Sequence, residues 1–112
     1  MKPNYKRPFA QYVKKAHKPL QLMIEDAVEL VCDSPDIGEL KVGDLAGIRV
    51  YKFRFNRQEY LLAYRPPGRY STGKDLPPEF LFIDFYQVGS HENFYETLKH
   101  YLRQESSKGE TK

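Results

Sequence analysis

The hydrophobic period changes within residues 80–102, FLFIDFYQVGSHENFYETLKHYL. Its first part alternates between two sets of side chains: Phe80, Phe82, Asp84 and Tyr86 on one side, and Leu81, Ile83 and Phe85 on the other. Such alternation predicts a β-strand over residues 80–88. Apolar residues then recur at helical spacing, at Phe94, Leu98, Tyr101 and Leu102. The stretch therefore predicts a central strand that leads directly into a helix closing near Arg103.

The junction between this strand and this helix gathers groups that can exchange protons. Ser90 is a favourable N-cap, and Glu92 suits the positive end of a helix dipole. His91 and Tyr95 are four residues apart, so a helix that begins at Ser90 would place both on one face. We expect the two side chains to project together from the strand end.

Length and composition indicate one small domain. The chain has 112 residues, of which 40% are hydrophobic, which is enough for one core. We assign residues 1–104 to this domain and the polar residues 105–112 to a disordered tail. No apolar run is long enough to span a membrane, and no export signal is evident. The single Cys32 cannot form an internal disulfide, and no Cys/His spacing suits zinc, so we expect a cytoplasmic protein without metal or cofactor.

The net charge of +3 conceals three blocks of charge along the sequence. Residues 1–24 carry six Lys or Arg and no acid, and residues 25–46 carry seven acids against one Lys. Residues 49–74 carry seven Lys or Arg against one Glu. Basic blocks separated by an acidic helix predict an electropositive face for a polyanion. The alternative is that these blocks merely solvate outer surfaces.

Two helices are predicted before the sheet. Apolar residues share one face over residues 8–17 and again over residues 19–32, and Lys18-Pro19 separates the two segments. We expect a helix hairpin that packs on the sheet. Residues 1–7 show no periodicity and predict a loose start, whereas the Gly-rich residues 36–47 predict a connector.

A β-hairpin is predicted next. Tyr51, Phe53 and Phe55 alternate with Val50, Lys52 and Arg54, so the aromatic set is expected to face the core and the basic pair to face the other way. Asn56-Arg57 suits a tight turn into a second strand over residues 60–65. The predicted fold class is α+β: an N-terminal helix hairpin on a small antiparallel sheet of about three strands, with a C-terminal helix.

Three segments in this order resemble the RelE/ParE superfamily of bacterial toxins. They are residues 45–53, LAGIRVYKF, residues 60–64, YLLAY, and residues 85–95, FYQVGSHENFY. The resemblance covers roughly residues 10–102. It implies a type II toxin held inactive by a cognate antitoxin protein.

The resemblance implies two possible activities. RelE-like members cut messenger RNA in the ribosomal A site, and Lys52 and Arg54 resemble their two strand lysines. A further arginine of the family falls on Leu61, for which the nearby Arg65 can substitute. The family's functional arginine and tyrosine after the last strand correspond to the regions of His91 and Tyr95. ParE-like members share the scaffold and poison DNA gyrase without catalysis.

RNA cleavage by its own 2′-hydroxyl requires a base, an acid and cations that stabilise the charge on phosphorus. His91 suits either proton role, and Tyr95 suits an acid or an orienting donor. Glu92 is a second candidate base. Lys52 and Arg54 would hold the phosphate, and we assign RNA binding to Arg49, Arg65, Arg69 and Lys74. The structural alternatives are a capping histidine, a core tyrosine and a solvated basic face.

Residues 66–78 contain four prolines and two glycines, which predicts a long loop and not a strand. Its Arg69, Tyr70 and Lys74 suggest that it contacts the target or the antitoxin. Together with the resemblance, the sequence predicts a toxin that is a ribosome-dependent mRNA endonuclease, with the ribosome and mRNA as partners and no membrane. The alternatives are a gyrase poison and a binding module that has lost its toxicity.

Overall fold

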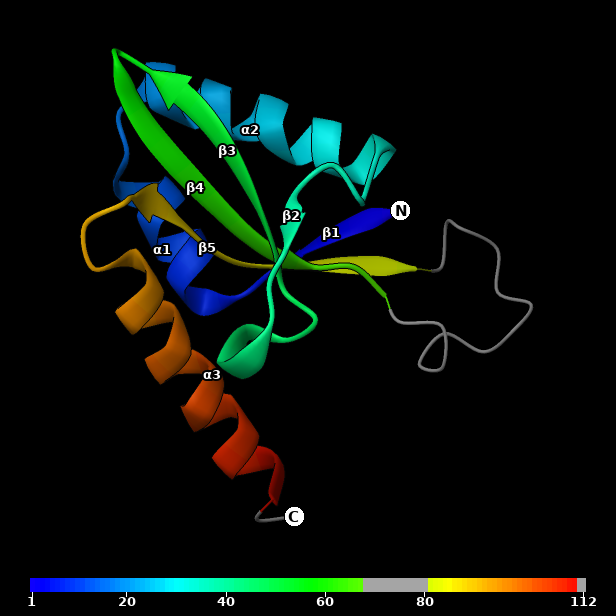
Figure 1. Cartoon of the computed structure of the whole chain (residues 1–112). Helices are drawn as coiled ribbons and strands as arrows, with labels where there is room; N and C mark the ends of the chain where they lie inside the picture. Colours follow the sequence, from blue (N-terminus) through cyan, green and yellow to red (C-terminus); the bar gives the residue numbers. More distant parts are fainter. Residues whose placement is uncertain (68–80, 111–112) are drawn as a thin grey trace.

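A computed structural model of the protein describes residues 1–67 and 81–110. Five strands form one mixed sheet, and three α-helices pack against it (Figure 1). The elements follow in the order β1 (Lys2–Tyr5), α1 (Arg7–Lys15), α2 (Lys18–Asp33), β2 (Glu39–Leu40), the short 3₁₀ helix η1 (Gly43–Leu45), β3 (Arg49–Phe55), β4 (Gln58–Arg65), β5 (Phe82–Ser90) and α3 (Phe94–Glu110). The α+β class is as predicted. The expected antiparallel sheet of about three strands is instead a mixed sheet of five, and β1 precedes the helix hairpin that was expected at the N-terminus.

The strand order in the sheet is β1-β5-β4-β3-β2. The three predicted strands, β3, β4 and β5, form its antiparallel centre. At one edge β1 pairs in parallel with β5, and at the other edge β2 pairs antiparallel to β3. Both additional strands are therefore edge strands, attached to the centre that the sequence predicted.

The first strand, β1, lies where the sequence predicted a loose start. All four of its residues are exposed, so no apolar alternation marks it. Its pairing is made by the backbone: the Lys2 amide donates to the Leu81 carbonyl at 3.0 Å, and the Lys6 amide donates to the Phe85 carbonyl at 2.9 Å. Pro3 is tolerated because an edge strand needs hydrogen bonds on one side only.

Tyr64 fastens the connector between α2 and β3 to the sheet. Its hydroxyl donates to the Pro35 carbonyl at 2.6 Å and accepts from the Gly38 amide at 2.9 Å. A Cβ at position 38 would lie 2.9 Å from this hydroxyl, so only glycine fits there. The two residues of β2 follow directly, too few for a sequence pattern.

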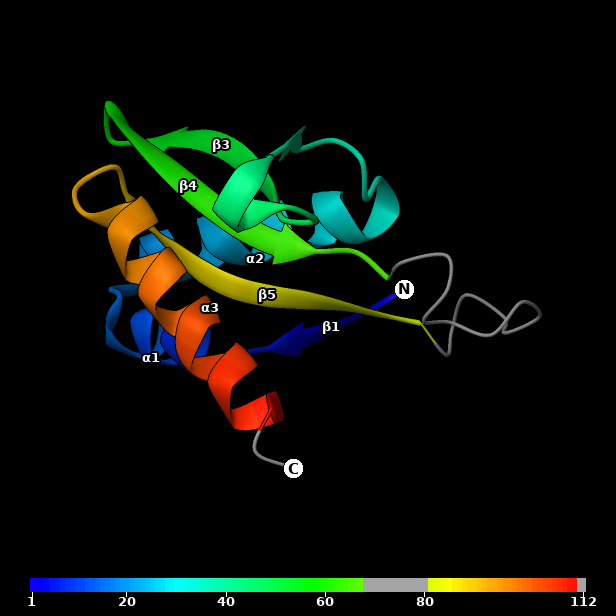
Figure 2. The same ribbon diagram turned by 60° about the horizontal axis from the view of Figure 1, so that its bottom comes forward.

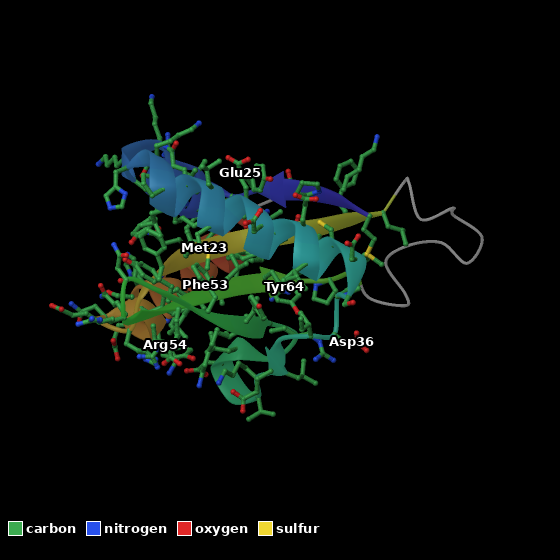
Figure 3. All side chains as sticks on the ribbon, turned by 90° about the horizontal axis from the view of Figure 1, so that it is seen from above. Met23, Glu25, Asp36, Phe53, Arg54 and Tyr64 are labelled. Carbon is green, nitrogen blue, oxygen red and sulfur yellow. The ribbon has the colours of Figure 1, made fainter. Side chains whose placement is uncertain are left out.

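Helices α1 and α2 cover one face of the sheet. Phe53, Leu62, Tyr64 and Phe85 point to this side and are buried against Phe9 of α1 and the apolar stripe of α2. Figure 3 shows Phe53 on the side of α2 and its neighbour Arg54 on the other side of the sheet. The predicted division of β3 between an aromatic face and a basic face is thus confirmed.

Helix α3 covers the opposite face (Figure 2). Phe94 and Leu98 of α3 pack on a smaller buried cluster, to which β3 contributes Val50 and β4 contributes Leu61 and Ala63. Lys52 and Arg54 are on this face but beyond the buried cluster, where both are exposed. Within the described residues, no helix is long and apolar enough to cross a membrane.

The junction between β5 and α3 differs from the prediction. Ser90 is the last residue of β5 and not a helix cap, and α3 begins only at Phe94. Asn93 has a φ of 57°, a left-handed conformation that Asn tolerates better than most residues and that separates the strand from the helix. His91 therefore precedes α3, and the prediction that His91 and Tyr95 share a helical face was wrong. At the other end, α3 continues through residues 105–110, which were expected to be a disordered tail.

Candidate active site

The β3–β4 hairpin places a basic pair beside a carboxylate. Asn56 and Arg57 form the turn with φ values of 51° and 65°, the geometry of a two-residue type I′ turn. This turn fixes the register so that Arg54 lies directly opposite Glu59 and Lys52 directly opposite Leu61. Since residues two apart on a strand share a face, Lys52, Arg54 and Glu59 project together on the α3 side of the sheet.

His91 completes this group. Its Nε2 atom lies 2.5 Å from a carboxylate oxygen of Glu59, although the two residues are 32 positions apart in the sequence. The side chains are 53% and 38% exposed, so the pair lies on an open surface. When Glu59 accepts a hydrogen from Nε2, the neutral ring presents an unprotonated Nδ1, which can act as a base. We call Lys52, Arg54, Glu59 and His91 the His91 cluster.

The other three members of the His91 cluster all lower the pKa of Glu59. The hydrogen bond from His91 lowers the pKa of Glu59, and the charges of Lys52 and Arg54 lower it further, outweighing slight desolvation. Glu59 is therefore an ionised acceptor at neutral pH. An ionised Glu59 orients the imidazole, while Lys52 and Arg54 remain available to an external anion.

Tyr95 lies in the first turn of α3 and contacts a different lysine. The Nζ atom of Lys41 is 5.5 Å from the centre of the Tyr95 ring. Lys41 in turn donates to Glu39 at 2.7 Å, and this hydrogen bond raises the pKa of Lys41 and lowers that of Glu39. Glu39 pairs with Val50 on β3, two residues from Lys52, and the charge of Lys52 also lowers the pKa of Glu39.

Arg65 lies at the opposite end of β4 from the His91 cluster. Its guanidinium is 5.4 Å from the centre of the Tyr86 ring, and its Nη1 donates to the Tyr86 hydroxyl at 3.3 Å. Burial raises the pKa of Tyr86, so this hydroxyl stays protonated and donates to Glu105 at 3.1 Å. Glu105 also forms an ion pair with Lys6 at 3.0 Å.

The remaining predicted site residues are not brought to the His91 cluster. Arg49 pairs with Tyr64 on the opposite face of the sheet, and its guanidinium donates to the carbonyls of Asp36 and Gly38. Glu92 is exposed and borders a separate cavity with Tyr12 of α1. Arg69 and Lys74 lie outside the described residues, as does nearly all of the predicted 66–78 loop. Among residues 1–67 and 81–110, no three His, Cys, Asp or Glu side chains are placed to hold a metal ion.

Comparison with known proteins assigns the family. The sequence model of the family described as "ParE-like toxin of type II bacterial toxin-antitoxin system" matches residues 4–99. The chain belongs to this toxin family. The match spans the end of β1, the other four strands, helices α1 and α2 and the start of α3.

The toxin fold is also recognisable among solved structures. One chain in the crystal structure of the intact E. coli RelBE toxin-antitoxin complex aligns with a TM-score of 0.57 and 16% sequence identity. The alignment covers 81% of this toxin and 96% of that chain. At this identity, the likeness establishes a common fold. No curated protein sequence matches.

Sequence reasoning missed two residues that the structure places at or beside the candidate site, Glu59 and Lys41. Glu59 was recognisable from the hairpin, because a two-residue turn at Asn56-Arg57 sets residue 54 opposite residue 59. Lys41 had no such signal. It reaches Tyr95 only because the connector folds back as β2 and η1, which no local pattern predicted.

Proposed function

We propose that this toxin is a metal-independent endoribonuclease that cuts mRNA on the ribosome. The observation that carries the proposal is the His91–Glu59 hydrogen bond beside the two exposed cations Lys52 and Arg54. A base held by a carboxylate and a pair of free cations are the groups that 2′-hydroxyl attack on a phosphodiester requires.

His91 takes the 2′-hydroxyl proton through its free Nδ1 while Glu59 holds Nε2. The 2′-oxygen then forms a bond to phosphorus, and the bond from phosphorus to the 5′-oxygen breaks. A proton delivered to the 5′-oxygen completes the step, leaving a 2′,3′-cyclic phosphate and a 5′-hydroxyl. Tyr95, whose ring lies against the Lys41 ammonium, is assigned to donate or orient this proton.

Lys52 and Arg54 hold the scissile phosphate and stabilise its additional negative charge in the transition state. Arg offers a planar fork of donors and Lys a mobile point charge, so the pair can follow the phosphate as its geometry changes. Arg65, Arg69 and Lys74 are assigned to bind RNA outside the reacting bond. Arg49 is left out because its guanidinium is engaged on the other face.

The open position of the His91 cluster is consistent with a requirement for the ribosome. His91 and Glu59 are half-exposed, so water competes for every hydrogen bond that they make. On the ribosome, the mRNA would be bound in a distorted conformation, and the ribosome would cover the His91 cluster and exclude water. The partner that blocks this surface in the cell is proposed to be the cognate antitoxin.

The test is single-turnover cleavage of ribosome-bound mRNA by the wild type and His91→Ala. Loss of a general base lowers the rate by about 10² to 10⁴. The matched control is His100→Ala, which removes an exposed histidine from α3 and should leave the rate unchanged. A rate that survives His91→Ala would transfer the proton step to Tyr95 or Glu92.

The second candidate function is gyrase poisoning, favoured by the description of the matched family as ParE-like. A supercoiling assay with the same protein samples separates the two activities. Wild-type protein that leaves mRNA intact but traps cleaved DNA on gyrase would reject the RNase. In that case His91→Ala would matter only through a contact surface.

A further inference from the structure

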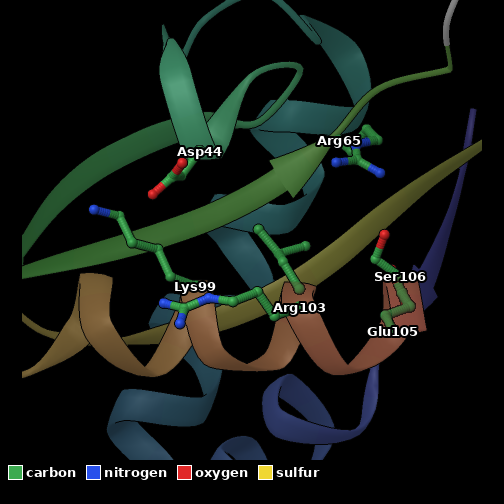
Figure 4. A pocket seen from close by; sticks show the side chains of 7 residues that line it. Asp44, Arg65, Lys99, Arg103, Glu105 and Ser106 are labelled. Carbon is green, nitrogen blue, oxygen red and sulfur yellow. The ribbon is translucent and has the colours of Figure 1, made fainter. Parts of the chain in front are cut away.

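A cavity on the α3 side of the sheet has three basic residues in its lining. It has a volume of about 710 Å³ and is bordered by Asp44 of η1, Arg65 of β4, and Lys99, Arg103, Glu105 and Ser106 of α3 (Figure 4). This volume is within the usual range of ligand pockets, roughly 300 to 1,000 Å³. The cavity is therefore large enough to take a ligand and not only water.

Positive charge predominates in this cavity. Within the part of the chain that the structure describes, Arg65, Lys99 and Arg103 form no salt bridge. Glu105 adds little negative charge because it is paired with Lys6 at 3.0 Å. Asp44 is the remaining carboxylate, and Figure 4 shows it near the tip of Lys99. The cavity thus has an excess of positive charge.

A hydrogen-bonded chain fixes the position of Arg65. Lys6 holds Glu105, Glu105 accepts from the buried Tyr86 hydroxyl, and this hydroxyl accepts from Nη1 of Arg65. The guanidinium carries five N–H groups and donates one of them to Tyr86, so several donors remain for a ligand. A cation whose position is fixed before binding loses less entropy when it binds an anion.

A row of side chains on α3 leads from Tyr95 to the cavity. Tyr95, Lys99 and Arg103 are spaced four residues apart, so they form a row on one face of the helix. The row begins at Tyr95 beside Lys41 and ends at the cavity, a distance of about 12 Å along the helix axis. A chain of phosphates that passes the His91 cluster can therefore follow this row.

We propose that the cavity formed by Arg65, Lys99 and Arg103 binds a backbone phosphate of single-stranded RNA, outside the bond that is cut. The inference rests on the proposed RNase function, because it takes the substrate of that function as the ligand. Arg65 supplies a fixed, fork-shaped contact, and Lys99 and Arg103 supply mobile charges from α3. The cavity holds the RNA strand in register, whereas the His91 cluster performs the reaction.

The test measures binding without cleavage. All proteins carry His91→Ala, and the probe is a short fluorescein-labelled single-stranded RNA, followed by anisotropy at several salt concentrations. Lys99→Gln with Arg103→Gln should weaken binding on the order of tenfold and lower the salt slope by about 1.4, since each phosphate contact on a single strand contributes about 0.7. The matched control, Lys14→Gln with Lys18→Gln, removes the same charge from the helix hairpin on the other face and should change the affinity much less.

Arg65→Lys sharpens the test, because it keeps the charge but loses the fork and the hydrogen bond to Tyr86. We expect weaker binding with little change in the salt slope. Wild-type affinity in the Lys99/Arg103 variant, or an equal loss in the Lys14/Lys18 control, would overturn the proposal. The proposal would also be overturned if the Lys99/Arg103 substitutions weakened the binding of polyglutamate but not of RNA. That result would assign the cavity to an acidic protein segment. Because no arm of the test depends on cleavage, failure of the RNase proposal is seen separately in the ribosome assay.

Discussion

The two faces of the sheet are covered to different extents. Under α1 and α2, aromatic rings of the sheet are buried in one continuous core, in which Phe85 contacts the rings of Tyr5, Phe9 and Tyr64. Under α3 the buried cluster is smaller, and cations remain at both ends: Lys52 and Arg54 near the hairpin, Arg65 at the far end of β4. One face stabilises the fold, and the other leaves charge free for a ligand.

The largest expected effect is a difference in stability between substitutions on the two faces of β5. Phe85→Ala removes a fully buried ring from the α1–α2 face and should lower the free energy of unfolding by about 3 to 5 kcal/mol. Phe82→Ala, on the α3 side of the same strand, removes a ring that is 52% exposed and should change it by about 0.5 kcal/mol or less. Urea denaturation measures both. Similar losses in the two variants would contradict the division between the faces.

Tyr86→Phe tests the polar network on the α3 face. Loss of the hydroxyl that links Arg65 to Glu105 should cost about 1 kcal/mol at pH 8. Burial raises the pKa of Tyr86, so its stabilising effect is complete below the unfolded pKa of about 10 and is lost as the pH rises further. The difference between the wild type and Tyr86→Phe should therefore narrow between pH 8 and pH 10.5 in urea denaturation. A difference that widens would show that the hydroxyl is not the group that titrates.

Lys52→Ala with Arg54→Ala should alter activity without altering the fold. Both side chains are exposed beyond the buried cluster, so each substitution should change the free energy of unfolding by about 0.5 kcal/mol or less. Growth arrest on induction should nevertheless be lost. Lys14→Ala with Lys18→Ala is the control of equal charge. A folded double variant that remains fully toxic would remove Lys52 and Arg54 from the site.

The smallest expected effect is a change in the pKa of Glu59. In His91→Ala the hydrogen bond that lowers the pKa of Glu59 is lost, so this pKa should rise in an NMR titration of the carboxyl group. In the wild type, the contribution of Glu59 to stability is present above its unfolded pKa of about 4.3 and is lost as the pH falls through the folded value. An unchanged pKa in His91→Ala would mean that the two side chains do not interact in solution.

Sequence patterns predicted the elements that bury apolar side chains. The alternation of Tyr51, Phe53 and Phe55 with Lys52 and Arg54 predicted both the strand and its two faces, and the helical stripes predicted the hairpin. The edge strands β1 and β2 escaped prediction because their residues are exposed and they are held by backbone hydrogen bonds. Such bonds depend on the partner strand and leave no pattern in the residues themselves.

Only some residues of the candidate site could be proposed from local sequence patterns. Lys52 and Arg54 follow from the period of one strand, and His91 from its place after the next. The carboxylate that orients His91 comes from a third segment, and only the register of the hairpin brings Glu59 to it. The start of α3 was misplaced because Ser90 is a suitable cap, yet the strand pairing with Tyr60 extends β5 through Ser90.

The parallel pairing of β1 with β5 sets the order of events during synthesis. Residues 2–5 leave the ribosome before their partner strand, which is complete only at Ser90. At about 5 to 20 residues per second, the nascent chain must remain incomplete for several seconds before the sheet can close. His91 and Glu59 meet at the same late stage, because both depend on β5. The His91 cluster therefore cannot assemble until β5 has been synthesised and has paired with β4.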